Sequence, residues 1–325
     1  MKFGSLKSEA NRDGELVIVS KDGTRCLKVP DIAKSLRMAV ENWSAVKDRL
    51  KKSYDQLNDD PSVGEPVDES KMHSPMPRAF QWADGSAFLH HVALVRKSRN
   101  AEMPERLYEV PLMYQGGSDN FLAPNDDIPQ IDFSHGTDFE GEVGVITDYI
   151  PMGSTAEECL SKVLLVVIIN DVSLRGLIPE ELKAGFGFFH GKPPTAFAPF
   201  AVTPDELGEH WEEGRIHLPL NVEYNGEFFG KANGKAMHFN FGQLLEHACK
   251  TRPLMAGTII GSGTVSNDDP EAGSSCILER RMIEKIEEGA FKTPFMKEGD
   301  TVKISMSLPS GENIFGTISQ KVVKA

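Results

Sequence analysis

The chain has 325 residues, of which 40% are hydrophobic and 26% are charged, and its formal net charge is −13. This composition is ordinary for a globular protein, and the length allows one large core with a smaller domain appended. Because a negative surface repels nucleic acid and anionic lipid, we expect neither nucleic acid nor a membrane among its partners.

The cysteines and the N-terminal residues favour a cytoplasmic protein. The segment Met1 to Lys7 lacks the apolar core of a signal peptide. The longest apolar run, Val163 to Ile169, is too short to span a bilayer, which takes about 20 residues. No C-x-x-C pair occurs, so we interpret the cysteines as free thiols in a reducing compartment. They are Cys26, Cys159, Cys249 and Cys276.

Residues 1–72 are expected to form a small N-terminal domain. Glu15 to Ser20 predicts a strand, and Lys21 to Thr24 predicts a hairpin-type turn with an Asp-Gly signal. Apolar spacing near 3.6 from Asp31 to about Leu57 predicts a helix. Residues 59–77 are rich in Pro, Ser, Asp and Glu, a linker composition, so the boundary is placed within them.

Residues 73–325 are predicted to be mostly strand and loop with a few helices, a mainly β, α+β chain. Val163 to Asn170 is a continuous apolar run rich in β-branched residues, which is typical of a strand buried on both faces. Two further strands are predicted at 301–306 and 314–323. The predicted helices are 87–97, with Ser86 as its N-cap, then 155–162 and 241–248.

Two of these strands carry carboxylates. Glu140 and Glu142 are two apart on a predicted strand, so they share one face and repel each other unless a cation lies between them. An exposed strand edge is the alternative. Asp171 follows the apolar strand, where a buried carboxylate is costly unless it is paired or bound to metal. A turn cap or a bridge to Arg175 is the alternative there.

A fourth carboxylate, Asp84, precedes the predicted helix at 87–97. An all-oxygen set without cysteine suits a hard cation, Mg²⁺ or Ca²⁺, with Mn²⁺ as a further candidate. His91 lies on the second turn of that helix, and His90 faces about 100° away, so at most one of them points into a given site. A histidine bonded to a neighbouring carbonyl is the alternative.

Three further positions could contribute to a site. Lys192 lies between a glycine and two prolines, which restrict its backbone, although a solvent-facing loop lysine is the alternative. The segment 261–266 lacks the third glycine of a dinucleotide fingerprint, so we interpret it as a turn whose backbone and Thr264 hydroxyl approach a ligand. Glu279 follows Cys276-Ile277-Leu278 and is placed near a strand end.

In chain order these motifs resemble the fumarylacetoacetate hydrolase family, bacterial type. The pattern is Asp-x6-His, Tyr-Gln-Gly-Gly, Glu-x-Glu, Asn-Asp-x-Ser-x-Arg, Gly-Lys, Gly-Thr-x-Ser and Leu-Glu, and it extends from about Pro75 to Val323. The resemblance implies a mixed β-sandwich roll around one metal site, with 73–325 as the catalytic domain, and a homodimer.

The resemblance also implies roles for individual residues. The metal ligands would be Asp84, Glu140, Glu142 and Asp171. The catalytic residues would be His91 as general base, Glu279 as its orienting partner, and Lys192 and Arg175 facing the developing oxyanion. The contacts to the substrate carboxylate would be Tyr114 and Thr264.

The implied reaction is metal-dependent hydrolysis of a carbon–carbon bond in a small 1,3-diketo acid. The first candidate is fumarylacetoacetate, cleaved to fumarate and acetoacetate in aromatic amino-acid (tyrosine) catabolism. The alternatives are a fumarylpyruvate-type acylpyruvate hydrolase, or a keto-acid decarboxylase or isomerase of the same family. The His91–Glu279 pair favours hydrolysis, because decarboxylation does not require a base that activates water. A binding protein without activity would need broken catalytic positions, and none is broken.

Departures from the animal fumarylacetoacetases leave the substrate open. Ile178 stands where those enzymes carry glutamine, and Leu182 where they carry tyrosine. Their carboxylate-binding arginine has two candidates here, Arg96 and Arg99.

Overall fold

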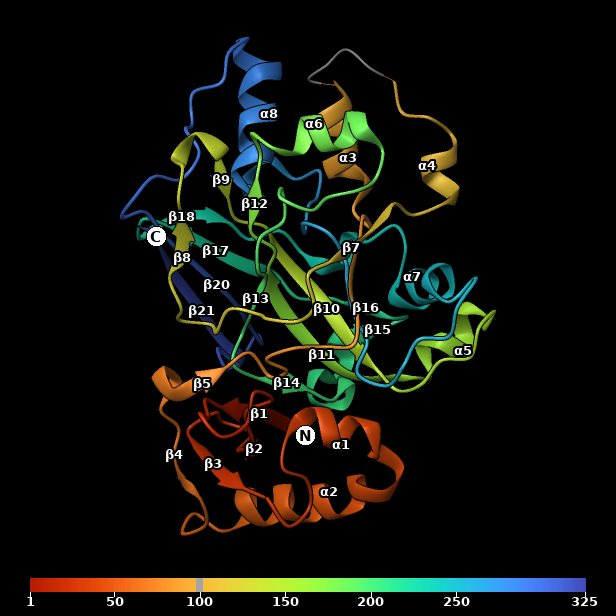
Figure 1. Cartoon of the computed structure of the whole chain (residues 1–325), viewed down its shortest axis with the longest axis vertical. Helices are drawn as coiled ribbons and strands as arrows, with labels where there is room; N and C mark the ends of the chain where they lie inside the picture. The colour runs from red at the N-terminus through yellow and green to blue at the C-terminus, as the bar shows by residue number, and fades with distance from the viewer. Residues whose placement is uncertain (98–101) are drawn as a thin grey trace.

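The computed structural model describes residues 1–97 and 102–325, so Arg99 lies outside the described residues. The fold is mixed α+β, built mainly of strands, with a small N-terminal domain at one end (Figure 1). None of the helices in these two ranges is long and apolar enough to cross a membrane. All four cysteines are buried free thiols, as predicted.

The N-terminal part packs two helices against a small group of antiparallel strands. These are β1 (Lys2–Leu6), β2 (Glu15–Val19), β3 (Arg25–Lys28), β4 (Glu65–Pro66), α1 (Leu36–Glu41) and α2 (Trp43–Asp59). The buried residues of α2 recur every three or four positions, which is the spacing of one helix face. The helix predicted from Asp31 begins later, at Leu36, and is interrupted at Asn42, the C-cap of α1.

The N-terminal strands continue into a large sheet, because β1 pairs with β14. Along this sheet the order is β4-β3-β2-β1-β14-β11-β10-β19-β6-β7. The added strands are β14 (Ala201–Val202), β11 (Val163–Asn170), β10 (Gly141–Thr147), β19 (Ile259–Gly261), β6 (Trp82–Gly85) and β7 (Met113–Gly116), with β13 (Ala196–Phe197) and β5 (Met72–His73) at its side. The predicted linker contains β4 and β5, and the domain boundary after residue 72 stays a prediction.

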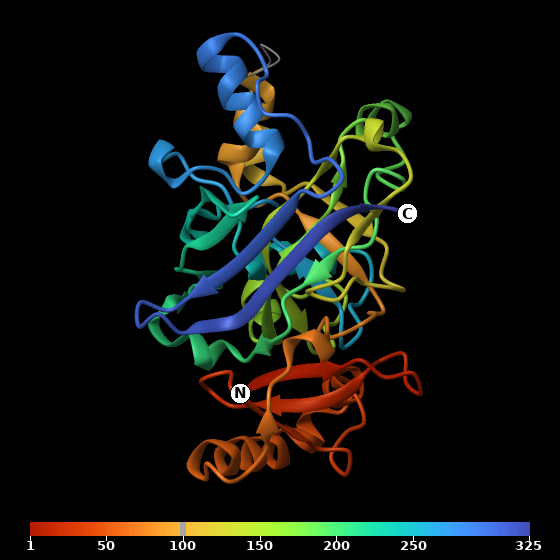
Figure 2. The ribbon, with the colours of Figure 1, turned by 90° about the vertical axis from the view of Figure 1, so that its left-hand side faces the viewer.

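A second sheet covers one face of the first. Its strands are β18 (Glu227–Gly230), β17 (Leu220–Tyr224), β20 (Thr301–Ser307), β21 (Asn313–Lys324) and β8 (Ile128–Gln130). The β20–β21 hairpin crosses the molecule diagonally in Figure 2. Between the sheets, Val166 and Ile168 of β11 pack in one hydrophobic cluster with Ile304 and Ile318. Val167 and Ile169 pack in another on the opposite face, so the prediction that β11 is buried on both faces is confirmed.

The remaining elements lie around these sheets. The helices are α3 (Leu89–Lys97), α4 (Arg106–Glu109), α5 (Ala156–Leu160), α6 (Ile178–Ala184), α7 (Phe241–Ala248) and α8 (Ile277–Glu288). The short strands are β9 (Thr137–Asp138), β12 (Ser173–Leu174), β15 (Trp211–Glu212) and β16 (Arg215–Ile216). The 3₁₀ segments are Glu69–Lys71, Phe133–His135, Pro204–His210, Gly234–Ala236 and Pro270–Ala272.

The predicted short helices are present, with one shifted start. α7 has the predicted bounds, and α5 begins after a capping box made by Thr155 and Glu158. α3 begins at Leu89 rather than Ala87, because the Ala87 carbonyl accepts the His238 N–H and the His91 N–H donates to the Phe88 carbonyl instead. Ser86 is therefore not its N-cap, and that prediction is wrong.

Candidate functional site

Three predicted ligands meet at one edge of the large sheet. Asp84 lies near the end of β6, Glu142 near the start of β10, and Asp171 directly after β11. β10 runs antiparallel to β11 and β19, and β6 runs parallel to β19, so these strand ends share an edge. One carboxylate oxygen from each of the three residues lies within 4.8 Å of the others.

The environment of this cluster fits a bound divalent cation. Neither oxygen of Glu142 has a hydrogen-bond partner among the described residues, although the residue is fully buried. Burial, followed by the charge of Asp171, raises the pKa of Asp84 to about 8. Burial, followed by the charge of Asp84, raises the pKa of Glu142 well above its usual value. Buried carboxylates without donors are costly, and a cation would supply the missing partner.

Glu140, the fourth predicted ligand, lies beside this cluster and forms ion pairs with the side chains of Arg175 and Lys192. Its carboxylate accepts from Arg175 Nη2 at 2.6 Å and from Lys192 Nζ at 2.5 Å. Lys192 Nζ also donates to Asp171 Oδ2 at 2.5 Å, so it connects Glu140 to the cluster. Burial acts to raise the pKa of Glu140, but Arg175 and Lys192 hold it below its usual value.

Asp171 is held by two hydroxyl groups as well. The Tyr114 hydroxyl donates to its Oδ2 at 2.5 Å, and the Thr195 hydroxyl donates to its Oδ1 at 2.8 Å. Thr195 was not predicted, and its residue type alone gave no signal. The Tyr114 ring contacts the Phe188 ring edge to face, with centroids 5.2 Å apart. The predicted contact between Tyr114 and a substrate carboxylate stays a prediction.

The last residue of β19, Gly261, and the loop that follows it contact Asp84. A Cβ at Gly261 would lie 2.4 Å from Asp84 Oδ1, so a side chain there would displace the carboxylate. Gly263 has a φ of +76°, and its N–H donates to the same oxygen at 2.9 Å. Thr264 is buried in this loop. The loop thus fixes a protein carboxylate, and its predicted contact with a ligand stays a prediction.

His91 and Glu279 are brought together from distant parts of the chain. His91 Nδ1 lies 2.9 Å from Glu279 Oε2, and Glu279 is buried. Ligand atoms of His91, Glu140 and Cys276 lie within 4.8 Å of one another, so His91 is next to Glu140, which Lys192 connects to the carboxylate cluster. The neighbouring His90 bonds through its Nδ1 to Ser266 Oγ at 2.8 Å instead.

Glu279 lies in the first turn of α8, so its predicted placement near a strand end is wrong. Cys276 is the N-cap of that helix, and its Sγ accepts the Glu279 N–H at 3.3 Å. Cysteine is not among the strongly preferred N-cap residues, so the start of this helix could not be recognised from its residue types.

Asp138 is a buried carboxylate that sequence reasoning missed. It accepts the backbone N–H groups of Ile277 and Leu278 at 2.8 and 2.9 Å, and Arg175 Nε at 2.9 Å. It therefore fixes both the start of α8 and the Arg175 side chain. A signal was present, because Asp138, Glu140 and Glu142 alternate in the sequence, although the structure divides this stretch between β9 and β10.

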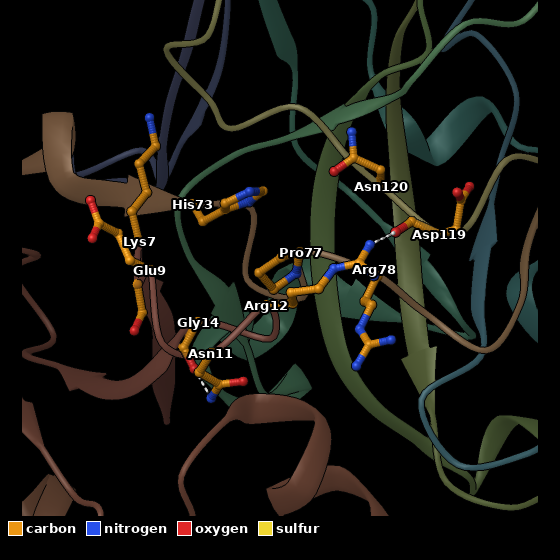
Figure 3. A pocket seen from close by; sticks show the side chains of 11 residues that line it. Lys7, Glu9, Asn11, Arg12, Gly14, His73, Pro77, Arg78, Asp119 and Asn120 are labelled. Atoms are coloured by element: carbon orange, nitrogen blue, oxygen red, sulfur yellow. Dashed lines mark hydrogen bonds between the residues drawn. The ribbon is translucent and has the colours of Figure 1, made fainter.

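A separate hollow of about 520 Å³ lies between the N-terminal domain and the rest of the chain. Its lining includes Lys7 and His73, and Arg12 lies beside Arg78 and donates to the Asp119 carbonyl (Figure 3). None of the predicted site residues lines this hollow. It is therefore distinct from the carboxylate cluster.

Two family models match the chain. The one described as "Fumarylacetoacetate (FAA) hydrolase C-terminal" matches residues 81–323. The one described as "Fumarylacetoacetase N-terminal domain 2" matches residues 1–78.

Three relatives show which activities occur in similar proteins. A 2,4-didehydro-3-deoxy-L-rhamnonate hydrolase of Sphingomonas sp. (strain SKA58) is 30% identical over 157 residues, which make up 47% of this chain and 52% of that protein. Fumarylacetoacetase of Caenorhabditis elegans is 25% identical, with 79% of this chain and 73% of that protein covered. An oxaloacetate tautomerase of Bacillus subtilis (strain 168) is 23% identical, with 79% and 74% covered.

A solved structure supports the fold. Maleylpyruvate hydrolase from Sphingobium sp. SYK-6, in complex with manganese(II) ion and pyruvate, aligns with a TM-score of 0.67 at 12% identity over 100% of both chains. The relatives thus include hydrolases and a tautomerase. Because the larger family model alone matches well over half of the residues, this chain belongs to the fumarylacetoacetate hydrolase family.

Proposed function

We propose that this chain is a metal-dependent hydrolase that cleaves a carbon–carbon bond in a small 1,3-diketo acid. Fumarylacetoacetate, giving fumarate and acetoacetate, is the first substrate to test. The observation that supports base-assisted chemistry is the His91–Glu279 pair, 2.9 Å apart and beside Glu140, and a comparison of substrates decides between hydrolysis and isomerisation. This arrangement supports the proposal that His91 acts as a base, with Glu279 as its orienting partner, beside a site that suits a cation.

Asp84, Glu142 and Asp171 are the proposed ligands, with Glu140 as the fourth. A divalent cation held there would act as a Lewis acid on a substrate carbonyl. The oxygen-only set favours Mg²⁺ or Ca²⁺. Mn²⁺ is the third candidate, supported by the manganese in the maleylpyruvate hydrolase structure.

The protein's own groups would carry the proton and the charge. With Nδ1 bonded to Glu279, the Nε2 of His91 is the nitrogen that can take a proton from water, and Glu279 would stabilise the imidazolium. Lys192 and Arg175 carry positive charge beside the cluster and would face the developing oxyanion. Tyr114 and Thr264 remain the proposed contacts to a substrate carboxylate. Of the two candidate arginines for the same role, Arg96 is the one within the described residues.

The second candidate is isomerisation or tautomerisation of a keto acid. The oxaloacetate tautomerase relative supports it, since the match covers 79% of this chain. A base such as His91 can also move a proton between carbon atoms, so the pair alone does not separate the two reactions. Hydrolysis of an acylpyruvate and decarboxylation of a keto acid are the other reactions to test.

The deciding experiment compares substrates with and without metal. Purified protein loaded with Mg²⁺, Ca²⁺ or Mn²⁺ is assayed on fumarylacetoacetate, fumarylpyruvate, maleylpyruvate and oxaloacetate. We expect hydrolytic products from one of the first three substrates and loss of turnover in EDTA. Full activity in excess EDTA would refute the metal requirement. Enolisation of oxaloacetate without release of CO₂ would assign the second candidate instead, and release of CO₂ would assign decarboxylation.

We further propose that the chain forms a homodimer, on the basis of the family resemblance. Several large apolar side chains are exposed, including Ile131 at 79%, and burying some of them would favour association. Static light scattering at micromolar concentration should give twice the mass of 35.8 kDa. A monomeric mass would contradict the proposal.

A further inference from the structure

The chain between Arg175 and Lys192 contains α6 and a segment rich in glycine and phenylalanine. α6 follows Arg175, and residues 185–191 lead from it to Lys192. Phe186 is 99% exposed and Phe189 is 81% exposed, so these two rings do not hold the segment in place, and Phe188, which is half-buried, contacts only one side of it through the Tyr114 ring. Gly185 and Gly187 have positive φ values, which adds backbone freedom. Some other interaction must therefore fix the backbone next to Lys192.

A single carboxylate supplies that interaction. Glu181, on α6, accepts the N–H of Phe189 at 3.1 Å and that of His190 at 2.7 Å through Oε1. Its Oε2 accepts the N–H of Gly191 at 3.0 Å. Hydrogen bonds to a carboxylate are stronger than those between neutral groups. The Glu181 side chain is only 16% exposed, so water competes weakly for these bonds.

Gly191 is held from its other side as well. Its carbonyl accepts the N–H of Leu174, on β12, at 2.8 Å. A Cβ at Gly191 would lie 2.6 Å from Ile178 Cγ1 and 2.9 Å from Glu181 Oε2, so only glycine fits against α6. The residue before Lys192 is thus fixed between α6 and β12.

We propose that Glu181 is a positioning residue, which sets the location of the Lys192 ammonium group through the backbone of residues 189–191. A lysine side chain has four flexible methylene groups, so its head is placed accurately only if its backbone is fixed. The Lys192 ammonium lies 2.5 Å from both Glu140 and Asp171. The inference rests on the proposed function in one respect, namely that Lys192 acts on the reacting oxygen.

Glu181→Gln is the test variant, because it keeps the side-chain shape and turns an NH₂ group toward one or more backbone N–H groups. Glu180→Gln is the matched control. Glu180 is one residue earlier on the same helix, is 76% exposed and forms an ion pair with Lys183. We expect Glu181→Gln to lower kcat about 10- to 100-fold, as small misplacements of a catalytic group do. KM and metal affinity should change less than threefold, and Glu180→Gln should match the parent.

A double-mutant cycle separates positioning from a general loss of structure. If Glu181 acts through Lys192, adding Glu181→Gln to Lys192→Ala should lower kcat less than twofold further. Multiplicative losses would overturn the proposal. So would a Glu181→Gln variant with normal kcat.

A measurement without substrate keeps this proposal separable from the proposed function. Acetic anhydride labelling, followed by mass spectrometry, reports how readily Lys192 reacts. In the parent and in Glu180→Gln, the paired Lys192 should label slowly, and in Glu181→Gln at least fivefold faster. Equal labelling in all three proteins would refute the positioning role. Increased labelling in a protein that turns over no ketonic acid would sustain it while refuting the proposed function.

Discussion

Of the three carboxylates in the cluster, Glu142 is the one that lacks hydrogen-bond partners when no cation is bound. Both of its oxygens are buried without a partner. We predict that Glu142→Gln raises the stability of the metal-free protein by about 1 to 3 kcal/mol at neutral pH, because the Glu142 carboxyl, whose pKa is raised by burial, must take up a proton or stay charged without a partner when the protein folds. The same change should largely abolish stabilisation by added Mg²⁺ or Mn²⁺. Urea unfolding in EDTA and in excess metal measures both effects.

The control for this prediction is Glu158→Gln, which changes an exposed carboxylate in the capping box of α5. It should leave the stabilisation by metal unchanged. If Glu142→Gln retains the parental stabilisation by metal, Glu142 is not a ligand.

His91 and Glu279 are predicted to act as one unit. Glu279 contacts the imidazole and lies outside the carboxylate cluster. We expect His91→Ala and Glu279→Gln each to lower kcat by about 10²- to 10⁴-fold. The double variant should be little worse than His91→Ala, because losses within such a unit are not additive. Steady-state kinetics with metal content checked in each protein gives the answer.

His90→Ala serves as the comparison, since His90 bonds to Ser266 and not to Glu279. Its kcat should stay within a few-fold of the parent. Near-normal turnover in His91→Ala would remove His91 from the proposed catalytic residues.

At the scale of elements, Asp13 joins the N-terminal domain to the start of the larger part. Its carboxylate accepts hydrogen bonds from Arg37 Nη2 at 2.8 Å and from Arg78 Nε at 2.7 Å, and Asp13 is only 5% exposed. Burial acts to raise its pKa, but the hydrogen bonds from Arg78 and Arg37 lower it below the usual value. Asp13→Asn should therefore destabilise the protein by about 1 to 2 kcal/mol at neutral pH, a value reduced because Arg78 is partly exposed.

The sign of the pH dependence follows from the lowered pKa. The stabilisation is present above the unfolded-state pKa of about 4 and is lost as the pH falls through the folded-state value. The difference in free energy of unfolding between Asp13→Asn and the parent should shrink toward acid pH. Glu41→Gln, which removes the other, more exposed partner of Arg37, should cost at most about 0.5 kcal/mol. An equal effect of both variants would count against the role of Asp13.

The sequence predicted elements where a local pattern decides the structure. β11 is a continuous apolar run, and α7 begins at an asparagine cap with glutamine three residues later. The start of α8 could not be predicted in this way. It depends on Asp138, which is distant in sequence and accepts the first two N–H groups of that helix. The pairing of β1 with β14 is also long-range, so no local pattern revealed that the sheet continues into the N-terminal domain.

The candidate site was predictable as a set of residue types but not as a set of contacts. Carboxylates at strand ends indicated a cluster, and the structure brings Asp84, Glu142 and Asp171 together. The pairing of Glu140 with Arg175 and Lys192 was not visible, because it depends on how three separate segments pack. The same holds for Thr195, which bonds to Asp171 because β13, directly after Thr195, pairs with the end of β11.

At the scale of the whole molecule, the net charge of −13 opposes an acidic substrate. The positively charged side chains of the site, Arg175 and Lys192, offer an acidic substrate little long-range attraction, because each is paired with two carboxylates. Added salt screens a repulsion that acts over distances greater than the Debye length, about 8 Å at 0.15 M. The encounter with a dianionic keto acid should therefore be easier at higher ionic strength.

We predict that kcat/KM for such a substrate rises about two- to tenfold between roughly 0.01 M and roughly 0.15 M ionic strength, while kcat changes little. The measurement is initial-rate kinetics at fixed free metal, with ionic strength set by a non-coordinating salt. A monoanionic substrate analogue should show about half the slope, because long-range repulsion scales with the ligand's charge. A fall in kcat/KM with salt would mean that attraction by local cations outweighs the net charge along the path to the site.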